Sequence, residues 1–334
     1  MTNASGIGSW PGTDSREAIR IVRDLLVEDG IPYLPETPAR GPGADMIGRA
    51  TGLLVELPVD LQPSGWRFVD RPGRDAARTA SFWRQDLDEI AEAYDGHTGP
   101  LKLQVTGPWT LAASVELNRG EKAAGDPAAR ADVIASLAEG VRLHLAEVAR
   151  LVPGADLVLQ LDEPGLPAVL EGRLPTVSGY GRLAAVDRQE VAAGLSEVLA
   201  AAGERTTVVH CCHPDAPLAL LRESGASAIA VDLDQWERLA PEPLWDTIAE
   251  IIESPVALWA GIHPSSGGGA GRDWRTSWDV LHARWVRLGL TASDLDRLVI
   301  TPACGLAWST PAEAVAAQRA AREIAKAATD LARS

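Results

Sequence analysis

Short apolar runs alternate with longer amphipathic segments along this chain, and no other feature constrains its fold as strongly. Each run ends in glycine, proline or polar residues, as buried strands do. The eight runs are SGIGSW (5–10), IPYLPE (31–36), LKLQVTG (101–107), DLVLQLDEP (156–164), TTVVHCC (206–212), AIAVDL (228–233), VALWAGIH (256–263) and RLVITPACG (297–305). Because strands that alternate with helices form parallel sheets, the pattern predicts an α/β fold.

The segments between the runs carry the signals of helices. Residues 15–30 and 188–203 repeat apolar side chains at helical spacing. In residues 310–332, a threonine is followed by proline at the first helical position and by glutamate soon after. That order is typical of a helix N-terminus, so we predict that a helix begins there.

Eight strands in one undivided chain predict a (β/α)8 barrel, the TIM barrel, as a single domain of residues 1–334. The sequence has no internal repeat and no long linker that would divide it. The alternative is a doubly wound open sheet, but no glycine-rich phosphate loop follows the first run. The pattern therefore favours the barrel.

Composition excludes several classes of protein. Acidic residues outnumber basic ones by 46 to 31, a net charge of −15, and such a surface repels the phosphates of nucleic acids. No apolar run approaches the roughly 20 residues of a membrane span, and the first residues lack the pattern of a signal peptide. Three cysteines, two of them adjacent, do not indicate a disulfide framework. We expect a soluble, cytoplasmic protein that binds neither nucleic acid nor membranes.

Polar residues gather at the C-terminal ends of the apolar runs. In a TIM barrel these ends share one face, where active sites are built. The residues at these ends are Ser9, Glu36, Thr106, Asp162, Glu163, His210, Cys212, Asp232, His263 and Cys304.

Four of these residues have the chemistry of a metal site. In the stretch VVHCCHP, the strand period of two places His210 and Cys212 on one side and Cys211 on the other. Cys304 ends the eighth run, and Asp232 ends the sixth. One imidazole, two thiolates and a carboxylate make a four-coordinate zinc set, so we predict zinc at these strand ends.

The alternatives for these residues are structural. A buried cysteine is often a small hydrophobic residue, and the HxC pattern alone is weak. Asp234 competes with Asp232 for the fourth position, while we expect Cys211 in the core and His213 in a loop. The coincidence of the four candidate ligands at three strand ends favours the metal site, above all for His210, Cys212 and Cys304.

Six short motifs, in order along the chain, resemble those of one known family. They are IGSWPGT (7–13), TGPWTL (106–111), QLDEPGLP (160–167), HCC (210–212), AGIHPSS (260–266) and PACGL (302–306). They are similar to IGSFPQT, TGPVT, QIDEPAL, HMC, VYDIHSP and PDCGL in the catalytic C-terminal barrel of the cobalamin-independent methionine synthases. The resemblance covers essentially the whole chain.

The resemblance implies a methyltransferase that converts L-homocysteine to L-methionine, with zinc activating the thiol. The zinc ligands would be His210, Cys212, Cys304 and, where the family has glutamate, Asp232. The residues near the homocysteine or methionine backbone would be Gly8, Ser9, Glu36 and Asp162. His263 would be a proton donor.

Without the resemblance, several of these residues have other roles open to them. Asp162 can cap a helix or form a structural ion pair, and Ser9 can cap the turn that follows it. His263 can be a solvated loop imidazole, although its ordinary pKa suits acid catalysis. The glycine-rich residues 265–271 are either a lid or a surface loop.

The sequence departs from the family in ways that bear on the methyl donor. Full-length members carry a second, N-terminal barrel that contributes to folate binding, whereas this chain opens at the catalytic barrel. Ser114 stands where the family has a tryptophan that contacts the pterin ring. The donor is therefore expected to be either a methyl-folate or a protein-bound methylcorrinoid.

Two other functions remain alternatives. One is a corrinoid-linked methyl or alkyl transfer to a different thiol, since related enzymes also use an HxC…C zinc site. The other is a non-catalytic protein that binds zinc or methionine. The motifs IGSWPGT and QLDEP suit an amino-acid thiol and favour methionine formation.

Overall fold

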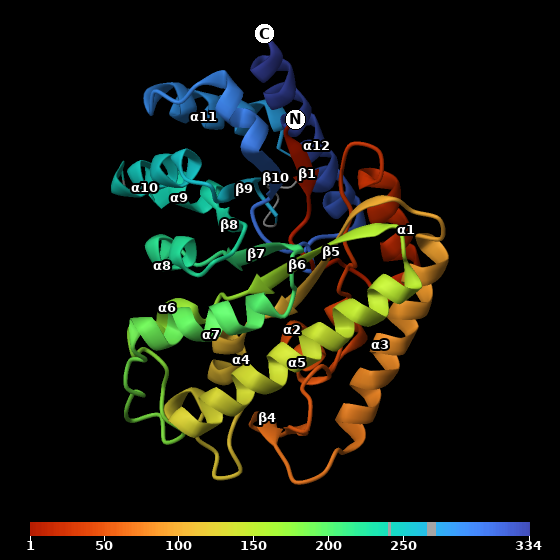
Figure 1. Ribbon diagram of the computed structural model, residues 1–334, viewed down its shortest axis with the longest axis vertical. Helices are drawn as coiled ribbons and strands as arrows, with labels where there is room; N and C mark the ends of the chain where they lie inside the picture. Colours follow the sequence, from red (N-terminus) through yellow and green to blue (C-terminus); the bar gives the residue numbers. More distant parts are fainter. Residues whose placement is uncertain (240–241, 266–271) are drawn as a thin grey trace.

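Eight parallel strands form a barrel at the centre of the molecule, with helices around it (Figure 1). The computed structural model describes residues 1–239, 242–265 and 272–334. The barrel strands are β1 (Asn3–Ser5), β2 (Gly30–Ile31), β5 (Gly99–Thr106), β6 (Ala155–Asp162), β7 (Thr206–Cys211), β8 (Ala228–Asp232), β9 (Ala257–His263) and β10 (Leu298–Pro302). Their order is β2-β1-β10-β9-β8-β7-β6-β5. The predicted TIM barrel is confirmed.

The barrel closes between its second strand and β5. Beyond Ile31 the chain continues beside β5, where Lys102 N donates to the Pro32 carbonyl at 2.8 Å and Leu34 N donates to the Lys102 carbonyl at 3.0 Å. The two shortest strands, β1 and β2, are also the ones that differ most from the predicted runs. Further along, Ser9 pairs with Glu36 in an isolated parallel bridge, so both segments still reach the same end of the barrel.

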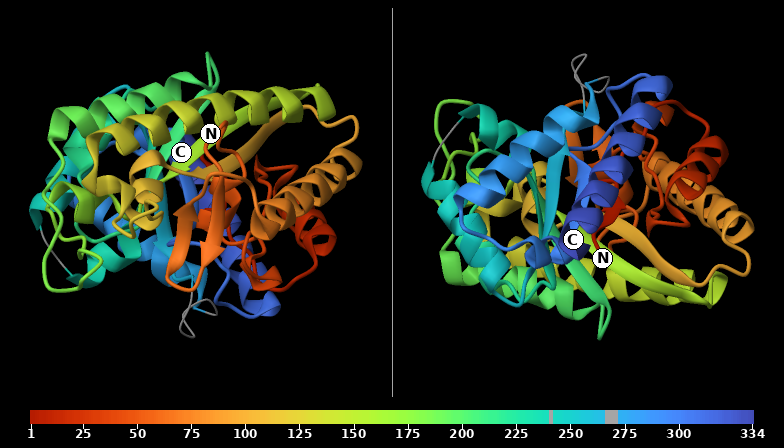
Figure 2. Two further views of the ribbon diagram at one scale, coloured as in Figure 1. Left: turned by 90° about the horizontal axis from the view of Figure 1, so that it is seen from below. Right: turned by 90° about the horizontal axis from the view of Figure 1, so that it is seen from above.

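Twelve α-helices are described, and they lie around the strands (Figure 2). They are α1 (Ser15–Leu26), α2 (Met46–Thr51), α3 (Arg74–Ala93), α4 (Pro108–Ser114), α5 (Pro127–Leu151), α6 (Leu166–Leu170), α7 (Arg188–Ala200), α8 (Leu218–Glu223), α9 (Leu233–Leu239), α10 (Glu242–Glu253), α11 (Trp274–Arg287) and α12 (Pro311–Arg333). Helices α1, α7 and α12 begin within one residue of the predicted segments. No helix in the described residues is long and apolar enough to cross a membrane.

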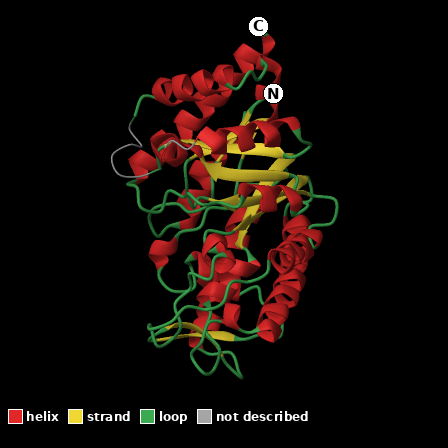
Figure 3. Cartoon of the chain, turned by 90° about the vertical axis from the view of Figure 1, so that its left-hand side faces the viewer, coloured by secondary structure: helices red, strands yellow, loops and turns green. Residues whose placement is uncertain are grey.

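One hairpin stands apart from the barrel. Strands β3 (Val59–Gln62) and β4 (Gly65–Phe68) pair antiparallel, and they lie at the end of the molecule opposite the two termini (Figure 3). The predicted pattern of runs does not include this hairpin. Its strands belong to the long connection between β2 and β5, which also supplies α2 and α3.

Successive side chains of the barrel strands point to opposite sides of the barrel wall. On β6, Leu157, Leu159 and Leu161 belong to the large core between the strands and the helices. Val158 joins a small apolar cluster with residues of β2, β7, β8, β9 and β10. Gln160 and Asp162 follow Val158 on its side of β6, so this side changes from apolar to polar toward the C-terminal end. The polar residues are thereby delivered to one end of the barrel.

Candidate metal centre and substrate pocket

His210, Cys212 and Cys304 come together at the C-terminal end of the barrel. One ligand atom from each lies within 4.8 Å of the others. His210 is the fifth residue of β7, Cys212 directly follows that strand, and Cys304 lies two residues beyond β10. The parallel barrel explains how residues so distant in sequence meet, because all its strands point their C-terminal ends to one face.

The His210 ring is oriented for metal binding. Its Nδ1 lies 2.7 Å from Asp162 Oδ1, whereas its buried Nε2 has no hydrogen-bond partner among the described residues. Burial alone would lower the pKa of His210, but the hydrogen bond and the charge of Asp162 outweigh burial and raise it. A histidine that binds a metal through one nitrogen typically places the other on a carboxylate. The residues present therefore fit a metal at His210 Nε2.

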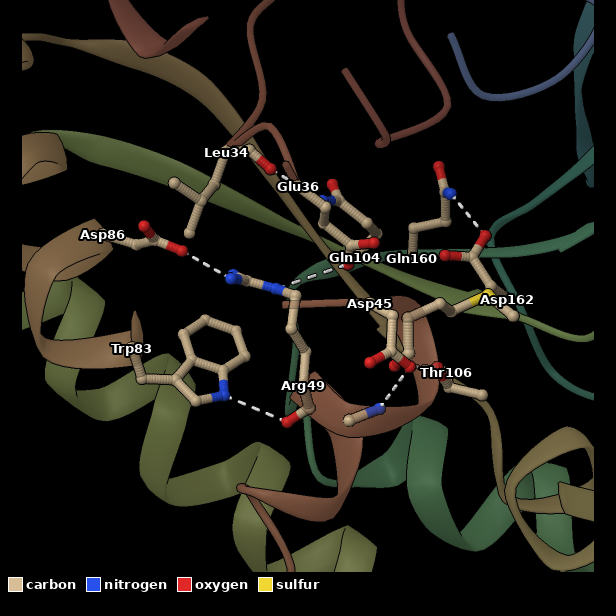
Figure 4. A network of polar contacts seen from close by, with 12 residues as sticks. Leu34, Glu36, Asp45, Arg49, Trp83, Asp86, Gln104, Thr106, Gln160 and Asp162 are labelled. Carbon is tan, nitrogen blue, oxygen red and sulfur yellow. Dashed lines mark hydrogen bonds and ion pairs between the residues drawn. The ribbon is translucent and has the colours of Figure 1, made fainter. Parts of the chain in front are cut away.

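Asp162 is held in turn from inside the barrel. Gln160 Nε2 donates to Asp162 Oδ1 at 2.7 Å, as Figure 4 shows. Lys102 Nζ donates to Gln160 Oε1 at 2.8 Å and to the Ile7 carbonyl at 2.7 Å. Sequence reasoning missed Lys102 and Gln160. Each is a polar residue within an apolar strand, on the same side as the polar residue at the strand end. Gln160 lies two residues before Asp162, and Lys102 lies four residues before Thr106.

The two thiols of the cluster influence each other. A hydrogen bond between Cys212 and Cys304 lowers the pKa of Cys304 and raises that of Cys212, because one thiol donates to the other's thiolate. Cys211 faces the core with 0% exposure, and burial raises its pKa to about 12. The predicted division between Cys211 and Cys212 agrees with their positions.

A cavity of about 370 Å³ lies against the cluster. The four residues predicted near the amino-acid backbone all line it, together with the three residues of the cluster: Gly8, Ser9, Glu36, Asp162, His210, Cys212 and Cys304. Met46 and the 92% exposed Trp308 also line it. The cavity thus joins the predicted substrate residues to the predicted metal residues.

The backbone around Ser9 leaves little space. Ala307 N lies 3.3 Å from Ser9 Oγ, and Leu306 N donates to the Ser9 carbonyl at 2.9 Å. A Cβ on Gly305 would lie 2.2 Å from Ser9 Oγ, so only glycine fits beside Cys304 without displacing Ser9. The PACGL turn and the segment that follows β1 are therefore packed together at the cavity.

Two other strand-end residues, Glu163 and Thr106, form hydrogen bonds to the backbone of neighbouring helices. Glu163 is buried, and its carboxylate accepts Trp109 N at 2.9 Å and Thr110 N at 2.7 Å, which anchors the start of α4. Thr106 Oγ1 donates to the Met46 carbonyl at 2.8 Å and ties α2 to β5.

Asp232 and His263 lie outside the three-residue cluster. Asp232 Oδ1 accepts the backbone N–H of Gln235 at 2.7 Å in the first turn of α9. His263 is buried at the end of β9, with Nδ1 3.2 Å from Ser277 Oγ. In the described part of the chain, neither residue lines the cavity. The predicted lid at 265–271 falls almost wholly on residues 266–271, outside the described residues.

Comparison with known proteins places these features in context. Residues 1–327 match the family model described as "Cobalamin-independent synthase, Catalytic domain". A B12-independent methionine synthase from Shewanella sp. W3-18-1, solved in complex with selenomethionine, is 13% identical, with a TM-score of 0.65 and 98% of each chain covered. No curated protein matches the sequence.

Two further solved structures show weaker likeness. A putative sugar phosphate isomerase/epimerase from Anabaena variabilis is 11% identical, with a TM-score of 0.40 over 81% of this chain and 87% of that one. D-psicose 3-epimerase from Clostridium cellulolyticum H10, with D-tagatose, is 12% identical, with a TM-score of 0.32 over 99% of this chain and 98% of that one.

Proposed function

Because the chain belongs to the family of cobalamin-independent synthase catalytic domains, we propose that it methylates the thiol of L-homocysteine and so forms L-methionine. The family makes the chain a methyltransferase. One observation supports this reaction more than any other. A histidine and two cysteines meet beside a cavity that is also lined by Glu36 and Asp162. We further propose that residues 1–334 act as one catalytic domain.

We propose that zinc binds His210 Nε2 and the sulfurs of Cys212 and Cys304. Thiolates and imidazole are the ligands that zinc prefers, and the unpartnered, buried Nε2 suits this role. When bound, zinc keeps a coordinated thiol deprotonated and therefore nucleophilic at neutral pH. Asp162 holds the His210 ring in place for this ligation.

Asp232 is our proposal for the fourth ligand. It ends β8, which lies beside β7 in the barrel. Asp232→Glu restores the longer side chain that the resemblance implies at this position. Tighter zinc binding in this variant would support the assignment, and unchanged metal affinity with unchanged activity would count against it.

The remaining residues bind and orient the amino acid. Glu36 and Asp162 offer carboxylates to the substrate ammonium group, and Gly8 and Ser9 contact its backbone. We propose His263 as the proton donor, with the ring oriented by the contact of its Nδ1 with Ser277. Together these groups would hold the homocysteine sulfur at the cluster.

The methyl donor is either a methyl-folate or a methylcorrinoid protein. At the position of the family's pterin-contacting tryptophan, Ser114 donates its hydroxyl to the Thr110 carbonyl at 2.7 Å. Trp308 places an exposed aromatic ring at the cavity instead.

The test supplies the zinc-loaded protein with homocysteine and each donor in turn, and measures methionine by mass spectrometry. We expect methionine with one of the two donors. Methylation of other thiols but not of homocysteine would favour the corrinoid-linked alternative. Binding of homocysteine without methionine from either donor would favour a non-catalytic zinc and methionine-binding protein.

A further inference from the structure

A buried set of charges lies directly behind Glu36. Asp86 of α3 has 0% exposure and accepts two hydrogen bonds of 2.8 Å from Arg40. Arg49 of α2 also donates to Asp86, through Nη1 (Figure 4). One carboxylate therefore holds two guanidinium groups, which leaves one positive charge for another partner.

Arg49 is fixed in this position from several sides. Its guanidinium stacks 3.9 Å above the centre of the Trp83 ring, and Trp83 Nε1 donates to the Arg49 carbonyl at 3.0 Å. The start of α2 is capped by Asp45, whose carboxylate accepts Gly48 N at 2.9 Å. The side chain of Arg49 thus projects from a short helix held rigid at both its backbone and its charged end.

The partner of the remaining charge is Glu36. Arg49 Nε is buried, makes no hydrogen bond within the described part of the chain, and lies 3.7 Å from Glu36 Oε1, an ion-pair distance. Glu36 is 5% exposed and lines the cavity, whereas the cavity lining does not include Arg49. Arg49 therefore pairs with Glu36 without itself lining the cavity.

Some of the groups around Glu36 raise the pKa of its carboxyl group, and others lower it. Burial has the largest effect and raises the pKa of Glu36 to about 7, and the negative charge of Asp162 also raises it. The positive charge of Arg49, the hydrogen bond from Gln104 and the positive charge of Lys102 lower it. Asp162 reaches it from β6 and Lys102 from β5. Of the opposing charges, that of Arg49 has the largest effect.

We propose that Arg49 is a positioning residue that favours the anionic form of Glu36 and holds its carboxylate at the cavity, so that Glu36 can pair with the ammonium group of the amino-acid substrate. This inference rests on the proposed function, because it concerns how that substrate is held. Asp86 and Trp83 fix Arg49, Arg49 fixes Glu36, and Glu36 contacts the substrate.

The test measures binding of L-methionine to the zinc-loaded protein by calorimetry between pH 6 and pH 9. Methionine is the probe because it has no thiol to titrate. If Arg49→Met raises the pKa of Glu36 from about 7 by about one unit, we expect the affinity to fall about fivefold at pH 7 and nearly tenfold at pH 6. The loss of affinity relative to wild type should become smaller as the pH rises, because Glu36 of the variant is then also ionised.

Arg40→Met is the matched control. It removes a buried arginine from the same carboxylate, but no ion pair joins Arg40 to Glu36 in the described residues. We expect this variant to bind methionine within about twofold of wild type at every pH. A twofold change in affinity is under about half a kcal/mol, since a tenfold change is about 1.4 kcal/mol.

On a Glu36→Gln background, Arg49→Met should have no further effect on affinity, because the charge of its partner is already gone.

Partial recovery in Arg49→Lys would support the proposal, since lysine keeps the charge but loses the planar fork. If Arg49→Met does not fold, Arg49→Gln removes the charge while keeping a polar side chain, and it carries the same test. Wild-type affinity in the Arg49 variants, or equal losses in Arg40→Met and Arg49→Met, would overturn the proposal alone. If wild-type protein does not bind methionine, the proposed function falls, and this inference falls with it.

Discussion

The contact between Asp162 and His210 determines which ring nitrogen is available to a metal. Nδ1 is engaged at 2.7 Å, and the buried Nε2 makes no hydrogen bond to the described residues. This contact also gives Asp162 a role that does not depend on substrate, because a fixed imidazole binds metal more tightly than one that must be oriented on binding.

Asp162→Asn should therefore weaken zinc affinity in the absence of any amino acid. Loss of such a hydrogen-bonded carboxylate typically costs about 10- to 100-fold in metal affinity. Competition with a coloured chelator measures the change. Asp156→Asn, at the exposed start of the same strand, is the control and should bind zinc as wild type does. Equal affinity in both variants would mean that Asp162 does not support the ligand.

Cys211→Ser should separate stability from metal binding. The side chain is fully buried on the core side of β7, so a serine hydroxyl there would be withdrawn from water, with the backbone N–H of His213 beside it. We expect the free energy of unfolding to fall by about 1–3 kcal/mol, measured in urea, with one zinc per chain retained. Zinc loss in this variant would contradict the assignment of Cys211 to the core.

At the residue scale, strand period and strand ends are enough to predict that His210, Cys212 and Cys304 meet. They do not predict Lys102, Gln160 or Arg49, because these groups matter through partners that are distant in sequence. The side that each strand presents to the barrel interior becomes visible only once the strands are paired.

At the scale of elements, the sequence predicts the start of a helix best where all the residues of a capping motif are present. Thr310 and Glu313 form a reciprocal capping box at the start of α12, with Pro311 at its first position. Strands β1 and β2 are the opposite case, because glycine and proline interrupt their runs and the chain pairs only in short stretches. The β3–β4 hairpin gave no comparable signal within its long connection.

Thr310→Ala should lower the free energy of unfolding by about 1 kcal/mol, since one N-terminal amide of α12 loses its acceptor. Chemical denaturation measures this change. Thr310→Ser keeps the hydroxyl and should stay close to wild type. If alanine and serine gave the same stability, the capping bond would contribute nothing to the fold.

At the scale of the whole molecule, the cluster connects β7 with the turn after β10. Strands β8 and β9 lie between them in the sheet order. A bound metal would therefore join parts of the barrel wall that are not hydrogen-bonded neighbours. The count of apolar runs predicts the barrel, but not its closure between β5 and the residues after β2, which depends on backbone pairing across the sheet.

Zinc should accordingly raise the thermal unfolding midpoint of metal-free protein. At a free zinc concentration about 100 times the dissociation constant, the expected stabilisation is about 2.7 kcal/mol. Cys304→Ser should show little of this increase. A shift of the same size in that variant would place the stabilising zinc elsewhere on the acidic surface.

The most direct test of the account is the zinc content of purified protein together with X-ray absorption at the zinc edge, with and without homocysteine. We predict about one zinc per chain, absent from Cys212→Ser and Cys304→Ser, with one more sulfur ligand when homocysteine is added. Zinc retained in both variants, or a ligand set unchanged by homocysteine, would contradict a thiol-activating centre at His210, Cys212 and Cys304.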